Sequence, residues 1–232
     1  MSSRFKIAII GDFNFTYNTH HATNLALDHA KELLDMDVSY YWVRIHEAAN
    51  FKTNDFLNYD AIWFAPGPFE NVFFLTGVLK RVLESKLPML ITGDAFREFI
   101  ELLIAQNNLN SNQEKLISDN LVMGEQYEKV QVTPVSNTLK KMYNDMGRLE
   151  VTATRYSLYP QLISYLTEEV IDVEAKNQFD DLEIISLKNH PFCVASMSIV
   201  QICSTRDMPH PLVTGFLNYL QQVRAREVDQ AG

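Results

Sequence analysis

The sequence has 232 residues and a net charge of −9, with 47% hydrophobic and 21% charged residues, which is an ordinary globular balance. The acidic charge argues against nucleic acid and anionic membranes as partners, because both would repel the chain. Two cysteines, Cys193 and Cys203, are too few for a disulfide scaffold or a cysteine-rich metal site. We expect reduced thiols, no metal and no cofactor.

The start of the chain carries one short apolar run, residues 5–10, which ends in Gly-Asp. This run is too short for a signal peptide or a membrane span. A cytoplasmic location is therefore expected.

The first hundred residues alternate between strand and helix patterns. Continuous apolar runs predict strands over 5–10, 38–43, 61–65 and 89–92, and helical spacing predicts helices over 19–34, 71–85 and 94–106. The buried helix faces are expected to carry Ala22, Leu25, Ala26, Ala30 and Leu33, then Val72, Leu75, Val78, Leu79 and Val82. This repetition predicts a three-layer α/β fold, with a mostly parallel central sheet and helices on both faces.

The second half of the chain has a different pattern. Residues 107–127 are polar and predict a surface loop. Short strands are predicted over 129–133, 150–155, 170–175, 182–187 and 192–197, and helices over 137–146 and 211–223. No linker divides the chain, so we predict one domain over residues 1–232.

Three segments are expected at the ligand-binding edge of the sheet, where the parallel strands end. They are Gly11–Asn14, Pro66–Phe69 and Thr92–Phe96. The third consists of a strand, one corner residue and a helix, which is the layout of a nucleophile elbow. The corner residue is Gly93, which tolerates a strained backbone but offers no nucleophile.

Four longer motifs follow one another along the chain. They are KIAIIGDF, YDAIWFAPGPFEN, LPMLITGDAFREF and HPFCVASMSIVQICS. Their order and spacing resemble class I glutamine amidotransferases, in particular the glutaminase domain of CTP synthase. A stand-alone group related to the C-terminal region of CTP synthase is also similar, through Gly11–Asn14, Thr19-His20 and His210–Leu212. The resemblance covers nearly the whole chain and implies a flavodoxin-like fold.

The catalytic residues of that family are not retained. In this register its cysteine falls on Gly93, its histidine on Ile199, its glutamate on Gln201 and its glutamine-contacting residue on Arg97. Glycine cannot replace the nucleophile and isoleucine cannot replace the base, so ordinary glutaminase activity is not expected. The chain also lacks a Gly-x4-Gly-Lys-Ser/Thr phosphate loop, so we expect no CTP synthesis by this chain alone.

Several polar residues near the predicted pocket have two interpretations. Asp94 is an acid–base residue or a first-turn aspartate that complements the helix dipole. Asp12 and Asn14 bind a ligand or form a turn that caps the next helix. His20 is an acid–base candidate, but a metal shared with His21 is awkward because adjacent helical residues point about 100° apart.

Four further residues are ambiguous in the same way. Arg97 attracts an anionic ligand or is an ordinary exposed arginine. Tyr156 and Tyr159 line the pocket or pack at a strand end. His210 begins the last helix or takes part in catalysis.

The leading hypothesis is an amidotransferase-like protein without glutaminase activity that binds a small ligand or a protein partner. Its predicted ligand-binding residues are Asp12, Asn14, Gly67, Pro68, Phe69, Thr92, Gly93, Asp94 and Arg97. The alternative is a hydrolase or lyase that uses Asp94 or His20 at the same pocket. A third hypothesis is an interaction role, for example as a homodimer.

Overall fold

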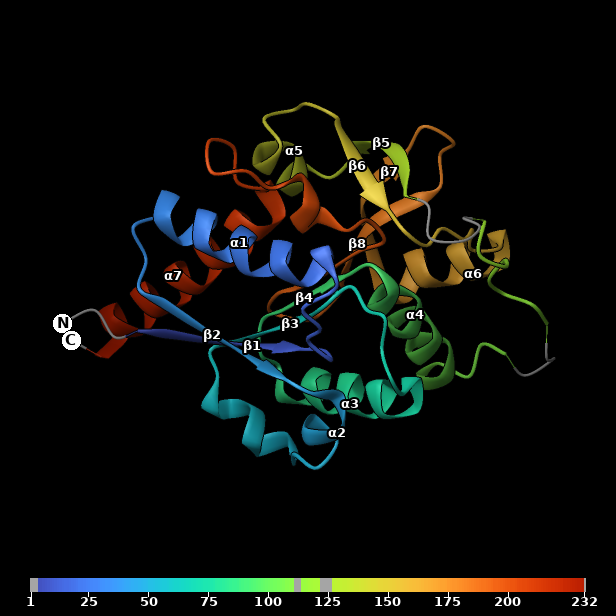
Figure 1. Ribbon diagram of the computed structural model, residues 1–232. Coiled ribbons are helices and arrows are strands. Elements are labelled where there is room, and N and C mark those ends of the chain that lie inside the picture. The colour runs from blue at the N-terminus through green and yellow to red at the C-terminus, as the bar shows by residue number, and fades with distance from the viewer. Residues whose placement is uncertain (1–3, 111–113, 122–126, 232) are drawn as a thin grey trace.

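The computed structural model describes residues 4–110, 114–121 and 127–231, which form a mixed α/β fold around one nine-stranded sheet (Figure 1). The strand order is β2-β1-β3-β4-β9-β8-β7-β5-β6. The strands are β1 (Phe5–Ile10), β2 (Val38–Val43), β3 (Ala61–Phe64), β4 (Met89–Thr92), β5 (Glu128–Pro134), β6 (Arg148–Thr152), β7 (Ile171–Asn177), β8 (Leu182–Leu187) and β9 (Cys193–Ser196).

Direction changes part of the way across the sheet. Strands β2, β1, β3, β4 and β9 are parallel neighbours, as the βα repetition of the first half predicts. Strands β8, β7, β5 and β6 continue the sheet in antiparallel pairs. Short links favour antiparallel pairing, because a parallel neighbour requires a longer crossover connection.

Long helices pack on both faces of the sheet (Figure 1). Helices α1 (Asn18–Leu33) and α7 (Pro211–Ala231) lie against one face, and α3 (Val72–Ser85) and α4 (Asp94–Gln106) against the other. The shorter elements are α2 (Ile45–Ala48), α5 (Asn137–Met142), α6 (Pro160–Tyr165), a π-helical turn (Leu166–Val170) and two 3₁₀ turns (Thr53–Asn58 and Val200–Cys203). Within the described ranges, no helix is both long and apolar enough to cross a bilayer.

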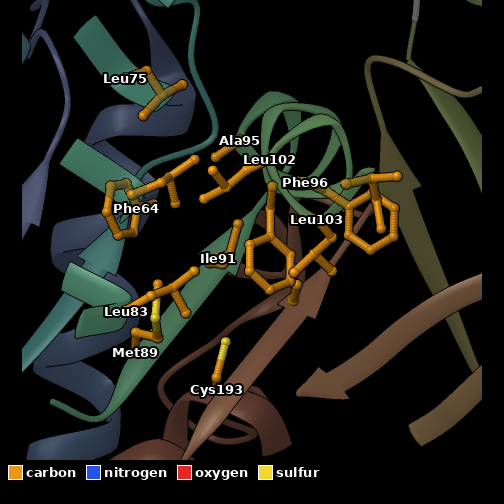
Figure 2. Close-up of a cluster of buried hydrophobic side chains, with 14 of the residues drawn as sticks. Phe64, Leu75, Leu83, Met89, Ile91, Ala95, Phe96, Leu102, Leu103 and Cys193 are labelled. Carbon is orange, nitrogen blue, oxygen red and sulfur yellow. The ribbon is translucent and has the colours of Figure 1, made fainter. Parts of the chain in front are cut away.

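The core beneath α3 and α4 fixes the position of the edge at which the parallel strands end. Figure 2 shows Phe64 of β3, Ile91 of β4, Leu75 of α3 and Phe96 of α4 within one cluster of buried side chains. Burying aliphatic and aromatic side chains of this size contributes about 1.5–3 kcal/mol each. This packing holds the start of α4 rigidly against the end of β4.

Helix α1 buries Ala26 and Ala30 as predicted, but the rest of its buried face differs from the prediction. Leu25 and Leu33 are exposed, whereas the polar residues His20 and Thr23 are buried. Thr23 accepts a hydrogen bond from Gln201, with 3.1 Å between the side-chain nitrogen and oxygen, so a polar group inside the protein determines which face turns inward. Hydrophobic spacing alone does not detect such a face.

Two boundaries in the second half also differ from the prediction. Helix α5 ends at Met142 and not at residue 146, because Asn144 and Asp145 take φ values of +53° and +57°, which a right-handed helix excludes. Strand β6 therefore begins earlier, at Arg148, and ends at Thr152. Helix α6, which begins with a proline, lies where no helix was predicted.

Candidate functional site

The corner between β4 and α4 is held from two sides. Gly93 has φ +64° and ψ −131°, backbone angles that favour glycine. Its N–H donates to the carbonyl of Ser196 on β9 at 3.1 Å, and the next N–H, of Asp94, donates to the carbonyl of Pro66 at 2.9 Å. The corner is therefore tied both to the sheet and to the turn after β3.

The space in front of Gly93 is filled by that turn. A Cβ atom added to Gly93 would lie 2.7 Å from Cβ and 2.9 Å from Cα of Pro66, far inside ordinary contact distance. The position from which a nucleophilic side chain would project is thus taken by Pro66. Ile199 and Gln201, at the positions where the sequence resemblance predicts the histidine and the glutamate, are both buried.

His20 bridges two of the loops at this edge. Its Nδ1 accepts from the N–H of Asn14 at 2.9 Å, which assigns the ring proton to Nε2, and Nε2 lies 3.1 Å from the carbonyl of Gly67 and donates to it. Burial lowers the pKa of His20 and favours the neutral ring. Since both ring nitrogens are engaged, His20 positions loops and has no free nitrogen for acid–base chemistry in this state.

Asp12 and Asn14 likewise use their side-chain oxygens within the protein. The two carboxylate oxygens of Asp12 accept from the N–H groups of Ile45 and Glu70, at 3.1 and 3.2 Å. Oδ1 of Asn14 accepts from the N–H and the hydroxyl of Thr16. Asn14 therefore forms a local turn with Thr16, whereas Asp12 joins the start of α2 to the segment after β3, and neither side chain caps α1.

An open cavity lies beside the corner, along the first turns of α4, and we call it the α4 cavity. Its volume is about 270 Å³. Its lining consists of Pro68, Phe69, Val72, Asp94, Arg97, Glu98, Asn120, Thr154 and Tyr156. The structure therefore brings together four of the predicted ligand-binding residues: Pro68, Phe69, Asp94 and Arg97. Gly67, Thr92 and Gly93, like Asp12 and Asn14, do not line it.

The acidic side chains of the α4 cavity are partly desolvated. Oδ1 of Asp94 accepts from the hydroxyl of Thr154 at 2.8 Å. Burial raises the pKa of Asp94, and the Thr154 hydrogen bond opposes the rise. Burial, reinforced by Glu101, also raises the pKa of Glu98 against the opposing pull of Arg97.

Tyr156 forms one wall of the α4 cavity and is only 2% exposed. The guanidinium of Arg97 lies over its ring, 5.3 Å from the ring centre. Within the described residues its hydroxyl is buried without a hydrogen-bond partner, and burial raises the pKa of Tyr156 well above the usual range. Of its two interpretations, pocket lining agrees with the structure, although the ring also packs on Phe96.

Sequence reasoning missed several members of this lining. Glu98 lies four residues after Asp94 on one helix, a spacing that places both on one face and could have identified it. Val72 was assigned to the buried face of α3, yet it is 47% exposed in the first turn, where its side chain borders the cavity. Thr154 comes from a segment sixty residues away in sequence, and no local pattern indicates it.

A buried carboxyl group lies on β8. Glu183 is 1% exposed and accepts from the side-chain amide of Asn177 at 2.8 Å and the hydroxyl of Ser198 at 3.5 Å. Burial raises its pKa to about 7, and its charge interacts with Tyr156. No sequence pattern indicates this burial, because a lone Glu in a short strand ordinarily faces solvent.

His210 and the cysteines lie apart from the α4 cavity lining. Nε2 of His210 lies 2.8 Å from the carboxylate of Glu150, with both side chains fully buried, and Nδ1 accepts from the N–H of Leu212. His210 therefore caps the start of α7. Cys193 and Cys203 are free thiols, and burial raises the pKa of both. No group of three or more His, Cys, Asp or Glu residues in the described part of the chain is arranged to hold a metal.

The fold is shared with solved structures at low sequence identity. The glutaminase domain of Trypanosoma brucei CTPS with bound acivicin superposes with a TM-score of 0.77 at 14% identity, covering 94% of each chain. A ThuA-like protein from Bacteroides uniformis superposes with a TM-score of 0.59 at 10% identity, covering 94% of this chain and 91% of the other. No family model and no curated protein matches the sequence. At such identities the comparison establishes a glutamine amidotransferase-like fold for this chain.

Proposed function

We propose that this chain binds a small molecule in the α4 cavity and has no Cys-His-Glu glutaminase activity. The observation that carries the proposal is a filled catalytic corner beside an open cavity: Pro66 packs on Gly93, while about 270 Å³ remains next to it. The backbone angles of Gly93 support its interpretation as a nucleophile elbow without a nucleophile. A volume near the lower end of the range for ligand pockets suits a small metabolite.

The absence of glutaminase activity is tested directly. Purified protein incubated with glutamine is expected to release no glutamate or ammonia above the level of buffer alone. The double variant Cys193→Ser, Cys203→Ser serves as the control for stray thiol chemistry. Wild-type turnover that is lost in this variant would contradict the proposal, because it would show hydrolysis by a cysteine. Turnover that persists in the variant would instead show a glutaminase that uses another nucleophile, and would contradict the absence of glutaminase activity more broadly.

Ligand binding is tested by obstructing the cavity. In an NMR screen of small metabolites, we expect shifts of the backbone amides of residues 94–98, and we expect Val72→Trp to abolish them by filling the mouth of the cavity. Leu25→Trp is the matched control, because Leu25 is a similarly exposed helical position that does not line the cavity. Shifts that survive Val72→Trp would place the binding site elsewhere.

A second candidate function is a hydrolase or lyase that uses Asp94 as its acid–base residue. The observation in its favour is that Asp94 lines the cavity with a raised pKa and, among the described residues, accepts a side-chain hydrogen bond only from Thr154. His20 does not share this support, since both of its nitrogens are engaged.

For such an enzyme, Asp94→Asn is expected to lower kcat at least about 100-fold, as for loss of a general acid or base. Thr154→Val removes a hydrogen bond that stabilises the carboxylate, so it should shift the acidic limb of the pH–rate profile upward. A panel of amides, esters and lactones followed by product release provides the measurement. Unchanged turnover in Asp94→Asn would exclude this function.

A further inference from the structure

We propose that the ligand of the α4 cavity presents a primary ammonium group to Asp94 and Glu98. This inference rests on the proposed small-molecule binding and adds the chemical class of the ligand. The inference is based on three properties of the cavity lining: its charge, its hydrogen-bond acceptors and its apolar side chains.

The charge of the cavity lining is unbalanced. Asp94 and Glu98 lie four residues apart on α4, and Arg97 supplies the lining's single permanent positive charge. Within the described residues neither carboxylate forms an ion pair; Asp94 accepts one hydrogen bond, from neutral Thr154. The guanidinium of Arg97 lies over the ring of Tyr156, 5.3 Å from the ring centre.

Desolvation increases the interaction of these carboxylates with a cation. Burial is the largest cause of the raised pKa of both groups, so water stabilises their ionised forms poorly. A cation that replaces the missing water interacts with them in a medium of low dielectric constant, where attraction at a given distance is stronger than in bulk water. A neutral ligand would leave both groups in the same unfavourable state.

Hydrogen-bond counting also favours an ammonium group. An ammonium offers three donors and no acceptor. The lining provides the carboxylate oxygens of Asp94 and Glu98. Donors on the ligand therefore match a lining rich in acceptors.

The rest of the lining restricts the remainder of the ligand. Pro68, Phe69 and Val72 form an apolar side of the cavity. Aromatic faces attract ammonium groups, and the ring of Phe69 is part of the lining. A short alkyl chain attached to the ammonium fits this combination, whereas an anionic ligand drawn to Arg97 would be repelled by two carboxylates.

The test compares three probes of equal chain length with the full-length protein: n-butylamine, 1-butanol and butyrate. NMR titration at pH 7.5 is expected to show n-butylamine shifting the amides of residues 94–98 and 154–156 at least about tenfold more tightly than either of the others. Asp94→Asn and Glu98→Gln should each weaken n-butylamine binding about tenfold, as expected for loss of a charged hydrogen-bond partner. Glu84→Gln is the matched control, because it removes an exposed carboxylate from the neighbouring helix α3 outside the lining, and it should change binding less than about twofold.

The possible outcomes separate the two proposals. Preferential binding of butyrate at the same amides would overturn the ammonium inference and leave small-molecule binding in place. Binding of n-butylamine that is unchanged in both Asp94→Asn and Glu98→Gln would also overturn it. If none of these probes and no metabolite of the screen shifts the cavity amides, the proposed function itself fails.

Discussion

Substitution of Gly93 by alanine is expected to lower the free energy of unfolding by about 4 kcal/mol. Backbone angles of φ +64° and ψ −131° cost a side-chain-bearing residue about 1–3 kcal/mol. The added Cβ would also lie 2.7 Å from Cβ of Pro66, and overpacking of this kind costs about 1–3 kcal/mol more. Urea unfolding followed by circular dichroism measures the effect.

Gly77→Ala provides the control for this prediction. Gly77 lies within α3, and the nearest atom to an added Cβ is a terminal nitrogen of Arg81 at 3.7 Å, which is an ordinary contact. Alanine is expected to stabilise the helix there by about 0.5–1 kcal/mol. Equal stability of Gly93→Ala and the wild type would contradict this prediction, because it would show that the turn at Pro66 shifts to accommodate a Cβ atom at little energetic cost.

The same geometry predicts that Gly93→Cys does not create a glutaminase. The new thiol would have to displace Pro66, and the buried Ile199 stands where the sequence resemblance predicts the histidine. We expect a destabilised protein with no release of glutamate from glutamine. Measurable turnover by Gly93→Cys would mean that the turn after β3 moves to admit the thiol. The corner could then support catalysis, contrary to this prediction.

Glu183→Gln is expected to stabilise the protein by about 3 kcal/mol at pH 8 and by almost nothing at pH 4. The folded state raises the pKa of Glu183 from 4.5 to about 7, mainly by burial. Between these values the folded state binds more protons than the unfolded state, so stability decreases as the pH rises through this window. About two and a half pKa units at 1.36 kcal/mol each give the stated size.

Glutamine preserves the hydrogen bonds at this position. Its carbonyl can accept from Asn177 and its amide can donate to Ser198, whose hydroxyl rotates to accept. Unfolding free energies at pH 4, 6 and 8 provide the measurement, and Glu101→Gln controls for loss of one exposed carboxylate. A destabilised variant at pH 8 would show that ionised Glu183 is stabilised by its surroundings.

The first half of the fold follows closely from sequence. Strands β1, β2 and β4 have the predicted bounds, and α3 and α4 begin within one residue of prediction. Continuous apolar runs and helical spacing are strong signals there, because each buried strand is covered on both faces. In the second half, the sequence predicts short strands but not whether they pair in parallel or antiparallel. A short strand pattern carries no information about which neighbouring strand it joins.

The candidate site also has features that the sequence predicts and others that only the structure shows. Local pattern located the strand–Gly93–helix corner and the Pro66–Phe69 turn. It could not reveal that His20 joins Asn14 to Gly67, because that bridge depends on where two loops meet in space.

The sequence by itself determined the parallel βα core and the absence of a nucleophile at Gly93, because both depend on residue types at fixed local spacing. Only the tertiary structure decided that Pro66 fills the corner and that the open space lies beside α4, next to Thr154 and Tyr156. It also decided that Glu183 is buried. The reason is physical: cavities and desolvated charges arise from contacts between segments distant in the chain.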